Sequence, residues 1–328
     1  MTDEPAPMLP PRAPGAAAPP AVGDLPPGGP PLSWQAAMFG ALTVLFWAAY
    51  NVAAKQGIDE GFRPADLSLL RFGVGGLVFV PLLLLPRFRA KLPTFKQTAV
   101  LMLLGGPLFA VLSSSGYQYA SLSHGLLFAP AAAFIGGALL GVLWLGEKVG
   151  RRHWLGGGVM MAGLAVLSGF DLVTLGVSEV LIGDALFVAT GLTWSMFTAM
   201  MRRWRVDPLS GTVAVGALSF VCVWPVNALL GSGPAILDMP AASLAGQAFF
   251  QGMIGGVGSF FAYFAAVAAL GAARASLLPA LVPGSALLMS VAALGAEARP
   301  AELAGIALVT LGLFLAARPS RVRRRVAA

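Results

Sequence analysis

The sequence predicts an all-α membrane protein with ten transmembrane helices in two inverted repeats of five. Its composition is the first observation: 57% of residues are hydrophobic, 11% are charged and the mean hydropathy is +0.81. Charged residues supply about a quarter of an ordinary soluble chain. Because a helix needs roughly 20 mainly apolar residues to cross a bilayer, we expect spans near 34–55, 67–85, 98–117, 126–145, 154–170, 181–201, 209–230, 244–270, 276–294 and 301–317.

An internal repeat is the second observation. The segment His124–Pro130 is echoed by Arg274–Ala280, and Glu147 and Glu297 follow at equal distances. In the first spans of the two halves, Trp47, Tyr50, Asn51 and Lys55 correspond to Trp194, Phe197, Thr198 and Arg202. Since five is odd, the second copy enters the membrane inverted relative to the first. Inverted repeats are typical of carriers with a site at the repeat interface.

The domain boundaries follow from this repeat. We predict a first repeat over 34–170 and a second over 181–317, with a basic tail at 318–328. Residues 1–33 are rich in Pro, Ala and Gly, which predicts disorder because they cannot bury enough apolar surface. They also lack the pattern of a cleavable signal peptide. The single cysteine, Cys222, excludes an internal disulfide and a cysteine-built metal site, and we predict no cofactor and no metal.

The basic residues predict the orientation, which is the third observation. Seventeen of the 21 lysines and arginines fall on one side of the predicted spans. Lys55, Arg63 and Arg299 fall on the other side, and Arg71 lies within a span. Basic loops stay in the cytoplasm. We therefore expect both termini in the cytoplasm of a cell with an inner membrane. The net charge of +7 favours contact with anionic lipid over nucleic acid, because the basic tail directly follows a span.

Several motifs, in their order and duplication, resemble the drug/metabolite transporter superfamily and its EamA-like group. They are FWAAYNVAAK (46–55), LSLLRF (67–72), the LGEK turn (145–148), LGGGVMMAGL (155–164) and the weaker copy LGAEARPAELAGIALVTLG (294–312). The resemblance covers 34–317 and implies ten helices in two inverted repeats that move small organic solutes such as amino acids. The second copy departs from the motif, with Ala296 where a glycine precedes the glutamate.

Arg71 is the most informative single residue, because a charge inside a span is costly unless it is paired or faces water. Pro64 and Pro81 match Pro208 and Pro225, which places Val215 opposite Arg71, so the scaffold does not require an arginine. Arg71 is then a cationic anchor for an anionic solute, or a gate charge paired with a carboxylate such as Asp66. The alternative is a side chain that snorkels to the outer headgroups.

A stripe of Trp47, Asn51 and Lys55, flanked by Tyr50, follows one face of the first span. Such a stripe suits a binding cavity, with aromatic rings for the solute body and polar groups that fix its orientation. Trp194 and Thr198 repeat part of it, which favours a pocket built from both halves. The alternative is an interfacial anchor for Lys55 and ordinary packing for the aromatic residues.

The remaining candidates lie near span ends. Tyr117 ends the third span, and Tyr263 matches Ser113 and can add a hydroxyl to the cavity. His124 is a candidate proton relay, although a turn histidine at the outer interface is the favoured interpretation. Asp184 is a candidate near the outer mouth.

Glu147 and Glu297 are expected to cap helices or pair with Lys148 or Arg299, and a gate role is the alternative. Pro130, Pro279 and Pro283 are expected to interrupt the fourth and ninth helices. The spacings Gly137-xxx-Gly141 and Gly252-xxx-Gly256 favour close helix packing or a homodimer.

No phosphate-loop, HExxH or GxSxG motif is present, so the chain is not expected to be an enzyme. The sequence instead predicts a secondary transporter of a small organic metabolite with an anionic group, working by export or exchange. The alternatives are a membrane protein that handles lipids and a non-transporting scaffold or sensor.

Overall fold

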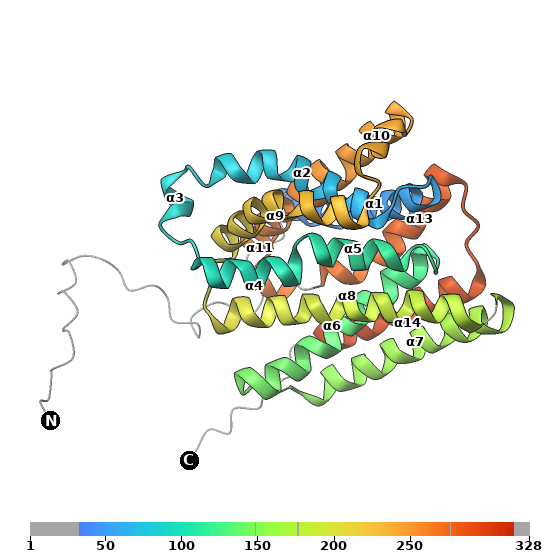
Figure 1. Ribbon diagram of the computed structural model, residues 1–328. Coiled ribbons are helices and arrows are strands. Elements are labelled where there is room, and N and C mark those ends of the chain that lie inside the picture. Colours follow the sequence, from blue (N-terminus) through green and yellow to red (C-terminus); the bar gives the residue numbers. More distant parts are fainter. Residues whose placement is uncertain (1–32, 148, 176, 276, 318–328) are drawn as a thin grey trace, which may run out of the picture.

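The computed structural model describes residues 33–147, 149–175, 177–275 and 277–317, without the side chains of 145, 168–175, 177–178, 272, 273 and 317. The predicted tails and Lys148 lie outside the described residues. Every regular element described is a helix (Figure 1). The elements are α1 (Trp34–Asp59), α2 (Pro64–Leu82), α3 (Pro86–Arg89), α4 (Phe95–Gly105), α5 (Pro107–Gly116), α6 (Leu122–Leu145), α7 (Arg151–Leu175), α8 (Val177–Arg203), α9 (Pro208–Leu230), η1 (Gly233–Asp238), α10 (Ala241–Gln247), η2 (Ala248–Gly258), α11 (Ser259–Leu270), α12 (Ala272–Ala275), η3 (Leu278–Leu281), α13 (Val282–Leu294) and α14 (Pro300–Ala317).

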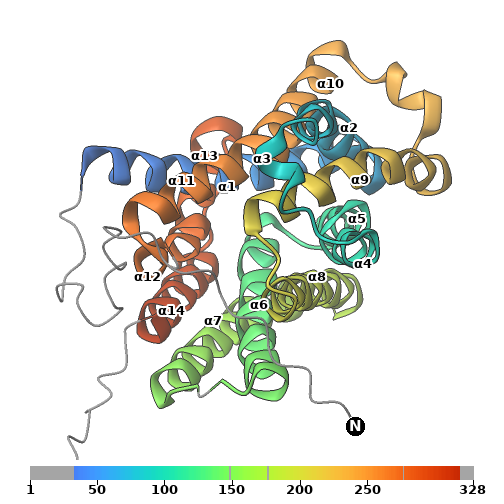
Figure 2. The ribbon, with the colours of Figure 1, turned by 90° about the vertical axis from the view of Figure 1, so that its left-hand side faces the viewer.

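These elements form ten passages, as predicted. Seven are long and apolar enough to cross a membrane, with α4–α5 and α10–η2–α11 each counted as one. Leu278–Leu294 and α14 are shorter apolar helices, and α7 is 25 residues long. The passages pack side by side as a bundle of crossing helices (Figure 1), and Figure 2 shows α4, α5 and α8 nearly end-on while α1 and α9 run across the view.

Successive passages run in opposite directions, which gives the bundle two ends. At the first end, which we call the basic end, Lys91, Arg202 and Arg205 line one open cavity of about 630 Å³. Glu147 forms an ion pair with Arg202, so the 146–150 turn lies there too. At the other end, which we call the opposite end, Arg63 donates to the carbonyl of Gly231. The described basic residues of the basic end are Arg87, Arg89, Lys91, Lys96, Arg151, Arg152, Arg202, Arg203, Arg205 and Arg274.

Polar caps begin several of these helices. The hydroxyl of Ser33 accepts from the amide of Ala36 at the start of α1, and Thr94 and Gln97 form a capping box at the start of α4. Asp207 caps α9. Burial alone would raise the pKa of Asp207, but the hydrogen bonds from Ser210 and the nearby Lys91 outweigh it, so this pKa lies below its usual value.

Glycine contacts between α7 and α14 show the inverted repeat directly. In the alignment of the halves, Gly156 corresponds to Gly305 and Gly163 to Gly312. A Cβ built on Gly156 would lie 2.4 Å from the carbonyl oxygen of Gly312, and one on Gly163 would lie 2.9 Å from that of Gly305. Gly156 therefore meets the counterpart of Gly163, and Gly163 meets the counterpart of Gly156. This exchange is what a pseudo-two-fold axis between the halves produces.

The third passage of each half is irregular at the same place. The first half breaks at Gly106 and Pro107, where α4 ends and α5 begins. The second half has the π-helical stretch η2 instead. A Cβ on Gly105 would lie 2.9 Å from Phe197, and a Cβ on its counterpart Gly255 would lie 2.9 Å from Tyr50. Neither irregularity was predicted from the sequence.

The predicted interruption at Pro130 is wrong, because α6 continues through this residue from Leu122 to Leu145. The ninth passage does begin irregularly, with the 3-10 turn η3 at Pro279 followed by α13. Gly252 and Gly256 pack against α2 at Val74 and at the backbone of Arg71. Their spacing therefore serves contact within the chain, and a homodimer stays a prediction.

Candidate functional site

A small pocket lies between three passages of the first half and one of the second. It is lined by Tyr50, Asn51 and Ala54 on α1, Leu67 and Arg71 on α2, Ala110, Ser113 and Ser114 on α5, and Gln251 on η2. Its volume of about 10 Å³ leaves room for at most one water. Among these lining residues none is acidic. The pocket is therefore polar, cationic and closed in this conformation.

The half-buried Arg71 points inward. Its guanidinium carbon lies 4.7 Å from the centre of the Tyr50 ring, a cation–π contact. Its Nη2 donates a long hydrogen bond of 3.4 Å to the carbonyl of Gly255. The snorkelling alternative does not describe this side chain, because its charged group lies against the pocket wall rather than at a helix end.

The predicted pairing of Arg71 with Asp66 is wrong. Asp66 is 1% exposed and its carboxylate already has four donors. It accepts from the side-chain amide of Asn227, from the backbone amide and hydroxyl of Ser232, and from the backbone amide of Arg63. This carboxylate caps the start of α2 and ties it to the end of α9, so it is not available to Arg71.

The polar groups on the α1 side of the pocket are held in place by hydrogen bonds. The amide of Asn51 donates to the carbonyl of Trp47 at 2.8 Å, and its oxygen accepts from the Tyr117 hydroxyl at 3.0 Å. Gln251 donates to the carbonyl of Tyr50 at 3.0 Å, and Gln247 donates to that of Ala53 at 2.8 Å. The structure therefore brings Tyr50, Asn51, Arg71 and Tyr117 together, as the sequence predicted.

Trp47 and Tyr263 lie beside this group without lining the pocket. Their ring centroids are 5.2 Å apart, and both pack against the buried cluster that includes Ala48 and Ala266. Trp47 sits one helical turn before Tyr50 on α1, toward the basic end. The two rings therefore lie next to the polar group but are not part of the lining of the closed pocket.

Three other predicted residues are not brought to the pocket. Lys55 forms an ion pair with Asp59, one turn further along α1. Trp194 stacks on Phe197 with ring centroids 5.1 Å apart, and the hydroxyl of Thr198 donates to the carbonyl of Ser195 in its own helix. The contribution of the second half comes from Gln251 instead.

The repeat gives three polar residues of the pocket an apolar counterpart at the basic end. Tyr50, Arg71 and Gln251 correspond to Phe197, Val215 and Leu101. These three are buried together in one apolar cluster. The same scaffold is therefore stable with apolar side chains at these positions, which argues that the polar set serves a ligand.

Gln247, Gln251, Ser113 and Ser114 are the candidates that the sequence reasoning did not place in the site. A signal was present: two glutamines stand four residues apart in an apolar span, so they share one helix face. Amide side chains inside a membrane helix need partners. Here the partners are backbone carbonyls of α1.

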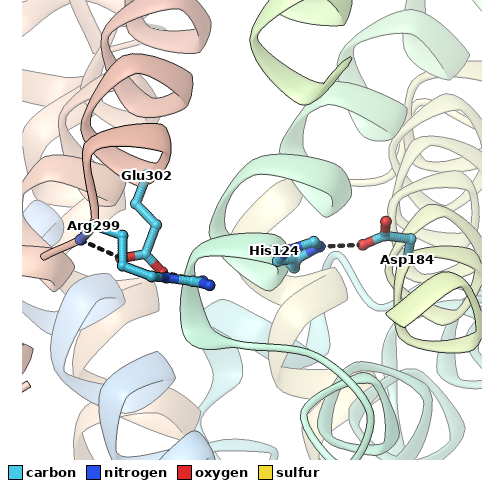
Figure 3. A network of polar contacts seen from close by, with 4 residues as sticks. All are labelled: His124, Asp184, Arg299 and Glu302. Carbon is cyan, nitrogen blue, oxygen red and sulfur yellow. Dashed lines mark hydrogen bonds and ion pairs between the residues drawn. The ribbon is translucent and has the colours of Figure 1, made fainter. Parts of the chain in front are cut away.

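His124 and Asp184 form a buried pair at the opposite end (Figure 3). His124 is 0% exposed and Asp184 is 5% exposed, and Nδ1 of the ring lies 2.5 Å from Oδ1 of the carboxylate. The interpretation of His124 as a turn residue at the outer interface is wrong. The helix α6 begins at Leu122, earlier than predicted, so His124 lies in its first turn against α8.

The two repeat-related glutamates differ in their surroundings. Glu147 pairs with Arg202, a neighbour that the sequence did not suggest, and both side chains are about half exposed. Glu297 is exposed in the turn before α14. Arg299 donates to Glu302 through its backbone amide at 3.1 Å and its guanidinium at 2.9 Å, a cap at the start of α14 (Figure 3).

Comparison with known proteins agrees with this architecture. The profile of the EamA-like transporter family matches residues 34–169 and again 181–318. No curated protein matches the chain. A solved structure titled "Crystal structure of protein" is 22% identical, with a TM-score of 0.55 over 86% of this chain and 96% of its own, and it supports the fold alone. With two family domains that together span most of its length, the chain belongs to the EamA-like transporter family, whose members are membrane transporters of small molecules and not enzymes.

Proposed function

We propose that this transporter moves a small organic metabolite with an anionic group, such as an amino acid or an organic acid, by alternating access. The observation that carries this proposal is Arg71, an inward-facing cation in a pocket with no acidic lining residue among those described. A guanidinium binds a carboxylate through two parallel hydrogen bonds. An anionic solute would therefore satisfy the charge that the pocket itself leaves unbalanced.

The present contacts of Arg71 are weak enough for a solute to replace. Its hydrogen bond to Gly255 is 3.4 Å long, and a cation–π contact contributes about 1–2 kcal/mol. A carboxylate would give a shorter, charge-assisted bond. The amides of Asn51 and Gln251 and the hydroxyls of Ser113 and Ser114 are placed to fix the polar part of the solute. Tyr50 would contact its apolar part.

The closed pocket supports alternating access as the way the solute enters and leaves. A volume of about 10 Å³ cannot hold a metabolite, so the surrounding passages must separate on binding. Two of them are irregular next to the pocket: η2 carries Gln251, and α5 begins just after the break at Gly106. We propose that movement at these points opens the pocket toward either end, with the basic end in the cytoplasm and net export or exchange.

Flux measurements in proteoliposomes test the solute class. We expect transport within a panel of amino acids and organic acids, and at least tenfold slower transport of the matched amides, in which the carboxylate is neutral. Arg71→Ala should abolish transport of the acids, because an unpaired anion would have to enter the membrane interior. Arg71→Lys should retain part of it, since it keeps the charge but not the planar donor fork.

Arg152→Ala is the matched control, because this arginine is exposed at the basic end, far along the sequence from the pocket. Its transport should equal that of the unaltered protein. Undiminished transport of acids by Arg71→Ala, or equal transport of acids and amides, would remove Arg71 from the site and overturn the anionic solute.

A further inference from the structure

The turn between α8 and α9 places an arginine in a backbone conformation that favours glycine. Arg205 has a φ of 51°, and among the described residues all the others with a positive φ are glycines. The turn is a Schellman motif: the amide of Arg205 donates to the carbonyl of Arg202 at 3.1 Å, and the amide of Val206 donates to that of Met201 at 3.0 Å. An arginine is strained at the left-handed position of this motif, because its Cβ crowds the backbone there.

The inverted repeat supplies a matched turn, between α1 and α2, and that turn uses glycine. Both turns lead into a proline that starts the next helix, Pro64 in α2 and Pro208 in α9, and this alignment places Gly61 opposite Arg205. Gly61 has a φ of 101°, and its amide donates to the carbonyl of Ile58 at 3.1 Å in the same motif. The scaffold therefore forms this turn with glycine. Strain retained at Arg205 indicates that its side chain serves something other than the turn.

The side chain of Arg205 lines the open cavity at the basic end. The second half contributes residues around the turn to this cavity, and the first half contributes Lys91 and Gln97. The end of α8 and the start of α4 lie on the same side of the molecule (Figure 1, left). The cavity volume of about 630 Å³ falls in the range of about 300–1,000 Å³ that is usual for ligand sites.

Two cations of this cavity have unused hydrogen-bond donors. In the described part of the chain, neither the ammonium group of Lys91 nor the guanidinium group of Arg205 forms a hydrogen bond or an ion pair. Lys91 lies near enough to Asp207 to lower the pKa of its carboxyl group, without forming an ion pair with it. The carboxylate of Asp207 is engaged elsewhere, because it accepts from the amide of Ser210 at 2.9 Å at the start of α9.

The charges around the cavity fit an anion with a single negative charge. Arg202 also lines the cavity, but its ion pair with Glu147 neutralises it. The two remaining cations, Lys91 and Arg205, exceed the remaining acid, Asp207, by a single positive charge. A phosphodiester carries a single negative charge, and a guanidinium binds its oxygens through two parallel hydrogen bonds.

The surroundings of the cavity favour a lipid over a soluble phosphodiester. Trp204 lines the cavity, and tryptophan is enriched where a membrane meets water. Phe95, in the first turn of α4 and two positions before Gln97, is 78% exposed. Acyl chains can cover such apolar side chains, which a soluble ester cannot. Basic pockets between membrane helices are known to bind the headgroups of anionic lipids.

We propose that this cavity binds the headgroup of an anionic phospholipid, with the donors of Arg205 and Lys91 on its phosphodiester and Trp204 beside its acyl chains. The arginine occupies the glycine position of the turn because its guanidinium is needed in the cavity. The bound lipid bridges the two halves at the basic end, since Lys91 belongs to the first half and Arg205 to the second. This site is separate from the solute pocket and does not depend on the solute class.

Lipid titration of the purified, delipidated protein in a neutral detergent tests the site. Short-chain phosphatidylglycerol is added, and thermal unfolding gives the melting temperature at each concentration. We expect a saturable rise with phosphatidylglycerol. We expect no such rise with phosphatidylcholine of the same chain length, which has no net charge, or with glycerophosphoglycerol, which is the same headgroup without acyl chains.

Arg205→Gly separates the ligand from the fold. Without lipid, the melting temperature of this variant should equal or exceed that of the unaltered protein, because glycine suits the left-handed position, as Gly61 does. The phosphatidylglycerol concentration that gives half of the rise should increase about fivefold, which is the effect of one basic residue near an anionic lipid surface. Lys91→Gln should give a similar increase, because it also removes one charge.

Arg152→Gln is the matched control, because Arg152 is exposed at the basic end and does not line the cavity. Its titration should equal that of the unaltered protein; an equal loss of affinity would show general attraction to the basic end and would overturn the site. An unchanged titration of Arg205→Gly would overturn it too, and so would a lower melting temperature of this variant without lipid. An equal rise with phosphatidylcholine or with glycerophosphoglycerol would exclude an anionic lipid as the ligand.

Discussion

Asp66 illustrates at the residue scale how a buried carboxylate can belong to the structure rather than to the pocket. Four donors from the start of α2 and the end of α9 surround it. The sequence could place Asp66 near Arg71, since Asp66 directly precedes the predicted span that holds Arg71, but it could not supply Asn227 and Ser232, which are more than 160 residues away. The prediction that Lys55 lines the pocket overlooked a partner in the same way. Its ammonium group forms an ion pair with Asp59, one turn later on α1.

Asp66→Ala should lower the stability of the protein by about 2–3 kcal/mol, because buried donors lose a charged acceptor. Thermal unfolding in detergent, followed by the loss of the monodisperse species, measures this. Asp238→Ala is the control, since Asp238 is exposed at the same end and its removal should change stability by less than about 0.5 kcal/mol. Equal melting temperatures for both variants would show that the Asp66 network does not hold α2 to α9.

At the scale of helices, the sequence could predict the ten passages because a long apolar run has no other stable arrangement in a bilayer. It could not predict how each third passage departs from an α-helix. The Gly-Gly-Pro at 105–107 was a visible signal for the break, whereas η2 reads as an ordinary Gly-rich helix. Whether such a segment becomes α or π depends on its neighbours, here Tyr50 and Val74 pressed against its glycines.

Helix packing predicts different effects on stability when two glycines of α7 are replaced by alanine. Gly156→Ala should destabilise the protein by about 1–3 kcal/mol, because the added methyl would lie 2.4 Å from the backbone oxygen of Gly312. Gly158→Ala should be neutral or stabilise by up to about 1 kcal/mol, because nothing lies within 4 Å and alanine favours the helix. Thermal unfolding of both variants measures these two changes in stability. Destabilisation by both would mean that α7 and α14 do not cross at Gly156.

At the scale of the whole molecule, a symmetric scaffold carries asymmetric chemistry. The halves exchange equivalent contacts at Gly156–Gly312 and Gly163–Gly305. The polar pocket, however, is matched by the apolar cluster of Leu101, Phe197 and Val215. The repeat was visible in the sequence, and Val215 already indicated that Arg71 is special. The pairing of His124 with Asp184 was not visible, because only the three-dimensional crossing of α6 and α8 brings residues 60 positions apart into contact.

The uneven distribution of basic residues between the two ends predicts how the whole bundle sits in the membrane. On the Cys222→Ser background, single cysteines at Arg89 and Arg203 should be protected from an impermeant maleimide in intact cells. Cysteines at Glu60 and Glu297 should react, because both positions are exposed at the opposite end. The cysteines at Arg89 and Arg203 should be protected because basic loops are retained in the cytoplasm. Permeabilised cells are the control, in which all four should react. Reaction at Arg89 or Arg203 in intact cells would reverse the predicted orientation.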